Sequence, residues 1–328
     1  MERPNYLKGA IFCLIATLSW GTMFPVMTHA LTWIDPFTFT ALRYLIAGIV
    51  FVVLLYAKEG TPAFNIRGER ILLAWLFGSA GFAGFGFLVF YGQQLAGATG
   101  ALTASIMMAT MPLLGLLVTW LLRGVRPPLF SFIYIGLSFC GVVLVITKGD
   151  ILGVLSHPQN YAANIPLILG ALCWVLYTVG GSYFPSWSAY KYTAITTVLG
   201  LTTIFVIVAI LLASGSIIMP STDTLVFTFP HLLYMSLVAG FIGVLCWNMG
   251  NKIITPLNGV LFMDVVPMTA FAISAMTGLV PTKVQIIGAL CTATALILNN
   301  IVQRQRMNKA GVVPILTVAV TTSVAVKG

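Results

Sequence analysis

The sequence predicts an all-α membrane protein of ten transmembrane helices, arranged as two inverted five-helix repeats around a central cavity. Three observations predict this class: the composition, the alternation of charge along the chain, and a local similarity between its two halves. Of the 328 residues, 59% are hydrophobic and only 7% are charged, whereas a soluble domain carries roughly 25% charged residues. So little charge could not cover a water-facing surface, so lipid must be the main solvent.

The helices follow from ten apolar runs. A crossing needs about 20 mostly apolar residues, because each residue of a helix rises about 1.5 Å. We expect helices at residues 7–32, 36–57, 70–91, 95–122, 127–147, 164–184, 188–213, 230–251, 255–279 and 283–303.

Basic residues support this count, because they fall on alternate connections between the runs. One set of connections holds twelve of them: Arg3, Lys8, Lys58, Arg67, Arg70, Arg123, Arg126, Lys191, Lys252, Arg304, Arg306 and Lys309. The other set holds only Lys148 and Lys283. The positive-inside pattern therefore predicts an inner-membrane protein with both termini in the cytoplasm.

Residues 148–163 form the longest outer connection and divide the chain in two. We expect a first repeat at 7–147, a periplasmic linker at 148–163, a second repeat at 164–303 and a cytoplasmic tail at 304–328. Five is an odd number of crossings, so the halves enter the membrane in opposite senses. Residues 312–326 are apolar but too short and β-branched for a confident span, and we assign them no role.

Local matches between the halves recur at a spacing of 152 to 155 residues. They pair Trp20 with Trp174, Met108 with Met263, Pro112 with Pro267, and Ile135-Gly136 with Ile287-Gly288. Inverted repeats with a binding site near the midplane are typical of many secondary transporters.

Several short motifs resemble those of the EamA family, in the drug/metabolite transporter superfamily. They are Trp20-Gly21, Phe24, Pro36, Arg43-Tyr44, Ala47, Pro112, Gly136 and Gly141, with Pro267 and Gly288 as a second copy. The resemblance covers roughly residues 7–303. The chain departs from the family where glutamates often follow helices four and nine, because residues 123–126 and 278–281 hold none.

The resemblance implies two five-helix bundles around a cavity lined by helices one, three, four, six, eight and nine. It also implies an exporter of amino acids and other metabolites, or a permease that takes up small nutrients. These implications reach the class of function only.

Motifs for other energy sources and chemistries are absent from the sequence. No GxxxxGK[ST] motif occurs, so transport is expected to depend on a gradient or on exchange. We expect a monomeric secondary transporter that exports an amino acid or related compound by alternating access, with the proton as a candidate coupling ion. It needs no cofactor, metal or nucleic acid. One alternative is an uptake permease for a nucleoside or vitamin. The other is an intramembrane enzyme, which would need paired carboxylates, a Ser/His set or metal ligands within the spans, whereas the spans hold one Asp and no mid-span His.

Arg43 and Asp264 are the two charged residues well inside the expected spans. An intramembrane charge is a functional hypothesis by default. For Arg43 we favour a structural role, bonded to backbone carbonyls or to Asp35, over a place in the site. Asp264 has three open roles: proton coupling, contact with a substrate amine, or a structural bond to Asn258, Thr269 or a free carbonyl.

Aromatic and amide side chains supply the candidate binding surface. Trp20 and Trp174 occupy matched midplane positions, and Tyr177 lies one turn from Trp174, so the three form either a stacking wall or simple packing. The candidate amides are Gln93, Gln94, Asn248 and Asn251. These amides either bind a zwitterionic substrate or form hydrogen bonds within and between helices.

Glycine and proline mark the candidate gating positions. Gly81 and Gly84 allow close packing of the third helix or act as a hinge. Pro112 and Pro267 each free a backbone carbonyl, so we expect kinks in helices four and nine.

Overall fold

A computed structural model describes residues 6–124, 131–150, 162–276 and 282–309, and within these ranges it contains helices and no strand. The elements are α1 (Tyr6–Ala30), α2 (Pro36–Glu59), η1 (Thr61–Phe64), α3 (Ile71–Gly78), η2 (Ser79–Gly84), α4 (Phe85–Leu95), η3 (Gly97–Thr99), α5 (Gly100–Met108), α6 (Met111–Arg123), α7 (Ser131–Thr147), α9 (Asn164–Gly180), η5 (Gly181–Tyr183), α10 (Ala189–Ala213), α11 (Thr222–Leu233), η6 (Tyr234–Gly243), α12 (Val244–Ile254), α13 (Pro256–Gly259), η7 (Val260–Asp264), α14 (Val265–Met276) and α15 (Lys283–Lys309). The all-helical class predicted from the sequence is confirmed.

Within the described residues, six continuous helical stretches are long and apolar enough to cross a membrane. They are Leu7–Ala30, Pro36–Glu59, Ile71–Leu95, Asn164–Tyr183, Ala189–Ala213 and Thr222–Ile254. A seventh results if Gly97–Met108 and Met111–Arg123, which meet at a bend of 44°, form one span. The chain is thus a multi-pass membrane protein, while the exact count of ten crossings stays a prediction.

Side-chain caps decide where several helices begin. Asp35 Oδ1 accepts hydrogen bonds from the backbone N–H groups of Phe37 and Thr38 at 2.9 and 2.8 Å, and Pro36 occupies the first position of α2. Ser221 caps α11 in the same way, accepting from Thr224 N at 3.2 Å. The eighth helix therefore begins at Thr222, before the expected start of its membrane span near residue 230, which stays a prediction.

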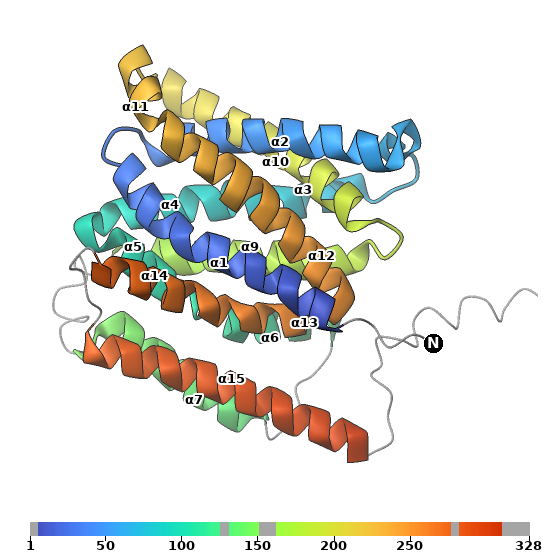
Figure 1. Cartoon of the computed structure of the whole chain (residues 1–328), viewed down its shortest axis with the longest axis vertical. Helices are drawn as coiled ribbons and strands as arrows, with labels where there is room; N and C mark the ends of the chain where they lie inside the picture. Colours follow the sequence, from blue (N-terminus) through green and yellow to red (C-terminus); the bar gives the residue numbers. More distant parts are fainter. Residues whose placement is uncertain (1–5, 125–130, 151–161, 277–281, 310–328) are drawn as a thin grey trace, which may run out of the picture.

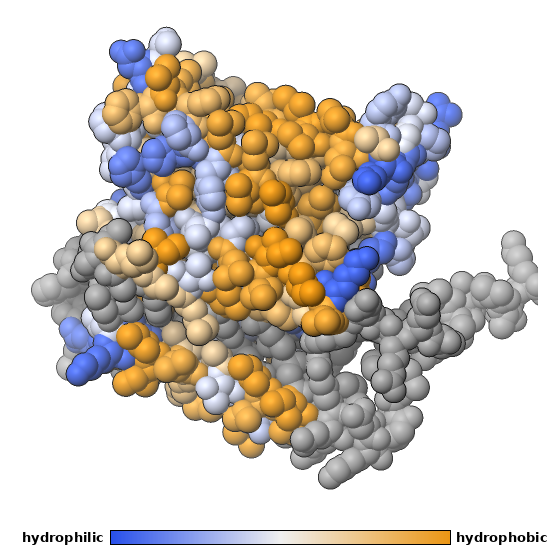
Figure 2. Space-filling model, in the orientation of Figure 1, coloured by the Kyte–Doolittle hydropathy of each residue, from blue (hydrophilic) through white to orange (hydrophobic). Residues whose placement is uncertain are grey.

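The apolar surface forms a belt across the middle of the helices. Figure 2 shows hydrophobic side chains between two polar zones, which lie at opposite ends of the helices drawn in Figure 1. This distribution matches a bilayer core flanked by two polar interfaces.

The packing brings helices of the two halves together. α1 contacts α12 and α14, α2 contacts α10, and α4 contacts α9. The last helices of the two halves, α7 and α15, lie side by side at one side of the molecule in Figure 1. The other helices are therefore free to enclose a cavity.

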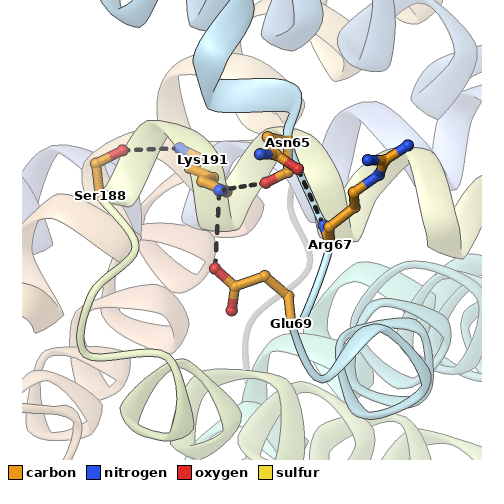
Figure 3. A network of polar contacts seen from close by, with 5 residues as sticks. All are labelled: Asn65, Arg67, Glu69, Ser188 and Lys191. Carbon is orange, nitrogen blue, oxygen red and sulfur yellow. Dashed lines mark hydrogen bonds and ion pairs between the residues drawn. The ribbon is translucent and has the colours of Figure 1, made fainter.

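Polar contacts join the two halves at one end of the helices (Figure 3). The Lys191 ammonium donates to the Asn65 carbonyl at 3.0 Å and lies 4.0 Å from a Glu69 carboxylate oxygen. The Lys191 backbone N–H also donates to the Ser188 hydroxyl at 2.9 Å. The connection after η1 is thereby fastened to the start of α10.

Residues 151–161, 277–281 and 310–328 lie outside the described ranges. Most of the expected periplasmic linker, part of the turn after the ninth helix and most of the tail therefore stay predictions.

Candidate substrate cavity

A closed cavity lies between the two halves of the chain. It is lined by Trp20, Met23 and Phe24 of α1, Arg43 and Tyr44 of α2, Phe85 of α4, Met108 of α5, Trp174 of α9, Val244 of α12, Met263 of η7 and Val266 of α14. The volume that the centre of a water molecule can occupy in the cavity is about 10 Å³, which is room for about one water molecule. A metabolite therefore requires the surrounding helices to move apart.

Aromatic rings form one wall of this cavity. Trp20 and Trp174 meet edge to face, with ring centroids 5.1 Å apart, and Phe85 lies 5.2 Å from Trp174. The Trp20 indole N–H donates to the Ala239 carbonyl at 3.0 Å. Trp174 is 3% exposed, and its indole N–H has no partner among the described residues. The two tryptophans expected at matched positions are thus brought into direct contact.

Tyr177 lies behind this wall and is absent from the cavity lining. Its ring stacks on Tyr192, with centroids 5.2 Å apart, and lies 5.1 Å from Trp174. Its hydroxyl accepts a hydrogen bond from the Asn248 amide at 2.6 Å. Tyr177 therefore supports Trp174 from behind, in the position of a packing residue.

Two π-helical turns, one in each half, directly precede the lining residues Phe85 and Val244. η2 begins at Ser79, and η6 begins 155 residues later at Tyr234. A Cβ at Gly240 in η6 would lie 3.7 Å from Arg43 Nε, and one at Gly243 would lie 2.7 Å from Trp20 Nε1. The first distance is an ordinary contact and the second leaves no room for a side chain, so η6 packs closely against Trp20. π turns recur at functional sites.

Arg43 lies in the cavity lining and is only 1% exposed. Its Nε and Nη1 groups have no hydrogen-bond partner among the described residues. The guanidinium carbon lies 4.7 Å from the Tyr44 ring centroid and 5.3 Å from that of Phe90. The expected bond to Asp35 is absent, because the described contacts of the Asp35 carboxylate are the backbone N–H groups at the start of α2.

The two aromatic contacts leave hydrogen-bond donors of Arg43 without a partner among the described residues. A central arginine costs about 2.5–3.5 kcal/mol on the insertion scale, and two cation–π contacts together return about 1–4 kcal/mol. A ring face also accepts no in-plane N–H bond, and an unmet buried donor costs roughly 1–3 kcal/mol. The guanidinium therefore has an unfilled demand for oxygen acceptors.

The candidate amides lie away from the cavity. Gln93 donates to the Phe24 carbonyl and to the Thr28 hydroxyl, both at 2.6 Å, and so ties α4 to α1. Gln94 is exposed. Asn248 bridges Tyr177 and Thr193, at 2.6 and 2.7 Å. Gln93 and Asn248 thus bond between helices and do not line this cavity, and a role of either in substrate binding stays a prediction.

Asn251 donates to the Trp247 carbonyl at 2.8 Å, within its own helix. Its buried amide oxygen has no partner among the described residues, but Asn251 does not line the cavity.

Breaks in the fourth and ninth helices lie beside the cavity. Met108 ends α5 and lines the cavity, and Pro112 is the second residue of α6 beyond the bend. Met263 lines the cavity from η7, and Pro267 is the third residue of α14. The paired methionines and prolines therefore occupy related positions around one site.

Asp264 is the last residue of η7 and directly follows Met263 in the chain. Its side chain lies outside the described residues, so all three roles considered for it stay predictions.

Gly81 and Gly84 lie where the third helix touches α9. A Cβ at Gly81 would be 2.5 Å from the Tyr177 ring, and one at Gly84 would be 2.8 Å from Cys173 Sγ. These distances leave no space for a side chain, and close packing alone accounts for both glycines.

Sequence reasoning did not single out Tyr44 and Phe85 as lining residues. Tyr44 follows an intramembrane arginine, and Phe85 follows the glycine-rich part of the third helix, which are the available signals. The spacing of Met108 and Met263 indicates the internal repeat but not that both line the cavity. The resemblance pointed to six lining helices, and the structure adds the second helix through Arg43 and Tyr44.

Comparisons with known proteins agree with this architecture. The model of the EamA-like transporter family matches the chain twice, at residues 7–147 and 162–301. Uncharacterized transporter YrdR of Bacillus subtilis (strain 168) is 38% identical over 305 residues, covering 93% of this chain and 95% of the relative. Uncharacterized transporter YyaM of the same organism is 26% identical, covering 87% and 91%.

A solved crystal structure of a protein superimposes with a TM-score of 0.64 at 19% identity. The superposition covers 90% of this chain and 97% of that protein. At this level of identity the likeness concerns the fold alone.

Proposed function

Because the chain belongs to the EamA-like transporter family, we propose that it is a secondary transporter that exports an amino acid or a related small metabolite across the inner membrane. The observation that carries this proposal is the closed cavity between the halves, lined by aromatic and sulfur-containing side chains from both. Binding sites for small molecules are typically apolar and concave, with a few polar groups that orient the ligand.

Alternating access supplies the mechanism in this proposal. The cavity lies where α1 contacts α14 and α4 contacts α9, so a small rocking of one half against the other opens it toward one face. The matched positions of η2 and η6, and of Met108 and Met263, support an inverted repeat that makes both openings equivalent. The Lys191 network would then close one face.

The direct test is exchange in proteoliposomes. Vesicles containing the purified protein and an unlabelled compound should accumulate the labelled form of the same compound, at a rate that exceeds that of protein-free vesicles. The panel comprises amino acids, nucleosides and vitamins. Exchange of amino acids supports the proposal, exchange confined to nucleosides or vitamins supports the uptake alternative, and no exchange of any compound rejects the transport function.

The orientation is a separate prediction, based on loop charge. A periplasm-active phosphatase fused after Ser216, in the connection between α10 and α11, should be active, and the same reporter after Arg67 should be silent. The basic residues of the connection between α2 and α3, which contains Arg67, keep that connection in the cytoplasm. A cytoplasm-active reporter at the same two positions is the control, and it should give the opposite pattern. Activity after Arg67 would reverse the assigned topology.

Asp264 is the proposed coupling group, because a carboxylate in hydrocarbon is costly to ionise and can exchange a proton between the two facing states. Asp264→Asn is nearly isosteric and removes only the titration. We expect the variant to exchange substrate across vesicles but to lose acceleration by an imposed pH gradient. The measurement is exchange and gradient-driven flux in parallel, with Asp150→Asn as the matched control. Wild-type flux that ignores the gradient would eliminate coupling by protons.

A further inference from the structure

We propose that Arg43, Tyr44 and Trp174 form an oxyanion-binding site in the cavity, so that the transported compound carries a carboxylate with an apolar remainder. The inference rests on the proposed transport function and narrows its substrate class. Three donor side chains line one closed cavity, and each keeps a buried donor without a partner among the described residues: Arg43 Nε and Nη1, the Tyr44 hydroxyl and the Trp174 indole N–H.

Nearly all buried donors in proteins find an acceptor, and the other described donors without one, such as those of Trp187 and Ser236, do not line the cavity. Tyr44 is fully buried, and Arg43 and Trp174 are 1% and 3% exposed. These three side chains come from both halves of the chain, two from α2 and one from α9. An acceptor bound between them would satisfy donors of both halves at once and would join the halves in the occluded state.

The charge of the site selects an anion. Within the part of the chain whose side chains the structure describes, no carboxylate lies within 4.0 Å of Arg43; the one ion pair there joins Lys191 to Glu69. A guanidinium is not deprotonated in proteins, so Arg43 is a cation without a protein counter-ion in those ranges. Arginine binds planar carboxylates through paired, charge-assisted hydrogen bonds.

Arg43 is held in place for this role. Its guanidinium lies over the Tyr44 and Phe90 rings, at 4.7 and 5.3 Å. Gly240 of the π turn η6 lies next to it, since a Cβ there would lie 3.7 Å from Nε. A preorganised cation costs less to immobilise on binding than a free one.

The rest of the ligand is apolar in this account. Beyond the three donor side chains, the lining consists of Trp20, Met23, Phe24, Phe85, Met108, Val244, Met263 and Val266. The amides expected to bind a zwitterion lie elsewhere, with Gln93 bonded to α1 and Asn248 bonded to Tyr177. Apolar and aromatic carboxylates, including apolar amino acids, fit this lining.

Matched pairs of acid and amide test the site without any mutation. Protein in lipid nanodiscs is titrated calorimetrically with phenylacetate and phenylacetamide, and with 4-methylpentanoate and its amide. Each acid should bind roughly 10- to 100-fold more tightly than its amide, the range for a lost charge-assisted hydrogen bond. Equal affinities for acid and amide would overturn the oxyanion site, while exchange of uncharged compounds in vesicles would leave the transport function standing.

Variants locate the site. Arg43→Gln should lose the preference for acids, and Arg43→Lys should keep part of it, because a cation without the planar fork remains. Should Arg43→Gln fail to fold, Tyr44→Phe and Trp174→Phe each remove one donor and keep the ring, and each should narrow the gap between acid and amide. Arg67→Gln, which removes an exposed loop cation, is the matched control and should retain the full preference for the acid over its amide. Unchanged preference in all the cavity variants contradicts the assignment.

Inorganic anions are the alternative ligands for these three donor side chains. Titration with chloride and with phosphate, alone and in competition with phenylacetate, distinguishes them from an organic substrate. The carboxylate should displace either ion and should itself be exchanged across vesicles. Binding of chloride or phosphate that no carboxylate displaces would overturn the substrate class. No exchange of any compound would instead reject the transport function on which the inference rests.

Discussion

Trp174→Ala should weaken substrate binding by about 1–3 kcal/mol, a loss typical of a buried aromatic at the centre of a binding site. The indole contacts Trp20, Phe85 and Tyr177, with centroids 5.1 to 5.2 Å away. Truncation therefore removes the wall and the unpartnered N–H together. The measurement is the dissociation constant for the best substrate of the exchange screen, with stability followed in parallel by thermal unfolding.

Trp33→Ala is the matched control for Trp174. Trp33 is 50% exposed, packs on Phe227 with ring centroids 4.6 Å apart, and does not line the cavity. It should leave the dissociation constant within about 0.5 kcal/mol of the wild type. Trp174→Phe keeps a ring in the cavity and should fall between the two. An unchanged affinity in Trp174→Ala protein that unfolds like the wild type would reduce this residue to packing.

Gly78→Ala should destabilise the fold by about 1–3 kcal/mol, as expected for overpacking of a tight contact. Its Cβ would lie 2.2 Å from the Thr196 carbonyl oxygen and 3.0 Å from the Thr196 carbonyl carbon. Both atoms belong to the backbone of α10, so relief requires α3 and α10 to separate. From the other side, a Cβ at Gly200 would lie 2.6 Å from the Gly78 carbonyl oxygen.

Gly136→Ala in α7 is the control, because a Cβ there would meet nothing within 4 Å. Alanine is favoured over glycine in a helix by roughly 0.5–1 kcal/mol, so this variant should be neutral or slightly stabilised. Thermal unfolding in the same detergent compares the two proteins. A Gly78→Ala variant as stable as Gly136→Ala would contradict the close approach of α3 and α10.

Hydropathy and loop charge predicted the helical class and most helix positions, because the bilayer imposes length and apolarity on every crossing. They could not predict the interruptions within helices. The π turns η2 and η6 depend on backbone hydrogen bonding and on contacts across helices, whereas the bend after Met108 lies next to Pro112, where the sequence predicts a kink. The early start of α11 depends on one serine cap, which hydropathy does not register.

The cavity was predicted in part. The matched tryptophans followed from the internal similarity, and the structure places both in the lining. The direction of Arg43 could not be predicted, because α2 is apolar on almost every side and its pattern defines no face. Gln93 and Gln94 show the same difficulty: adjacent in the chain, one is buried and bonded to α1, while the other is exposed.

Access to the cavity from both sides of the membrane tests the account most directly. Met108→Cys, in a background where Cys13, Cys140, Cys173, Cys246 and Cys291 are replaced by alanine, places a thiol in the lining. A charged, membrane-impermeant thiol reagent is applied to right-side-out vesicles and to inverted vesicles. The account predicts modification from both sides, slowed by bound substrate, as the cavity opens alternately. A thiol that stays unmodified from both sides, in protein that still exchanges substrate, would show that transport does not pass through this cavity.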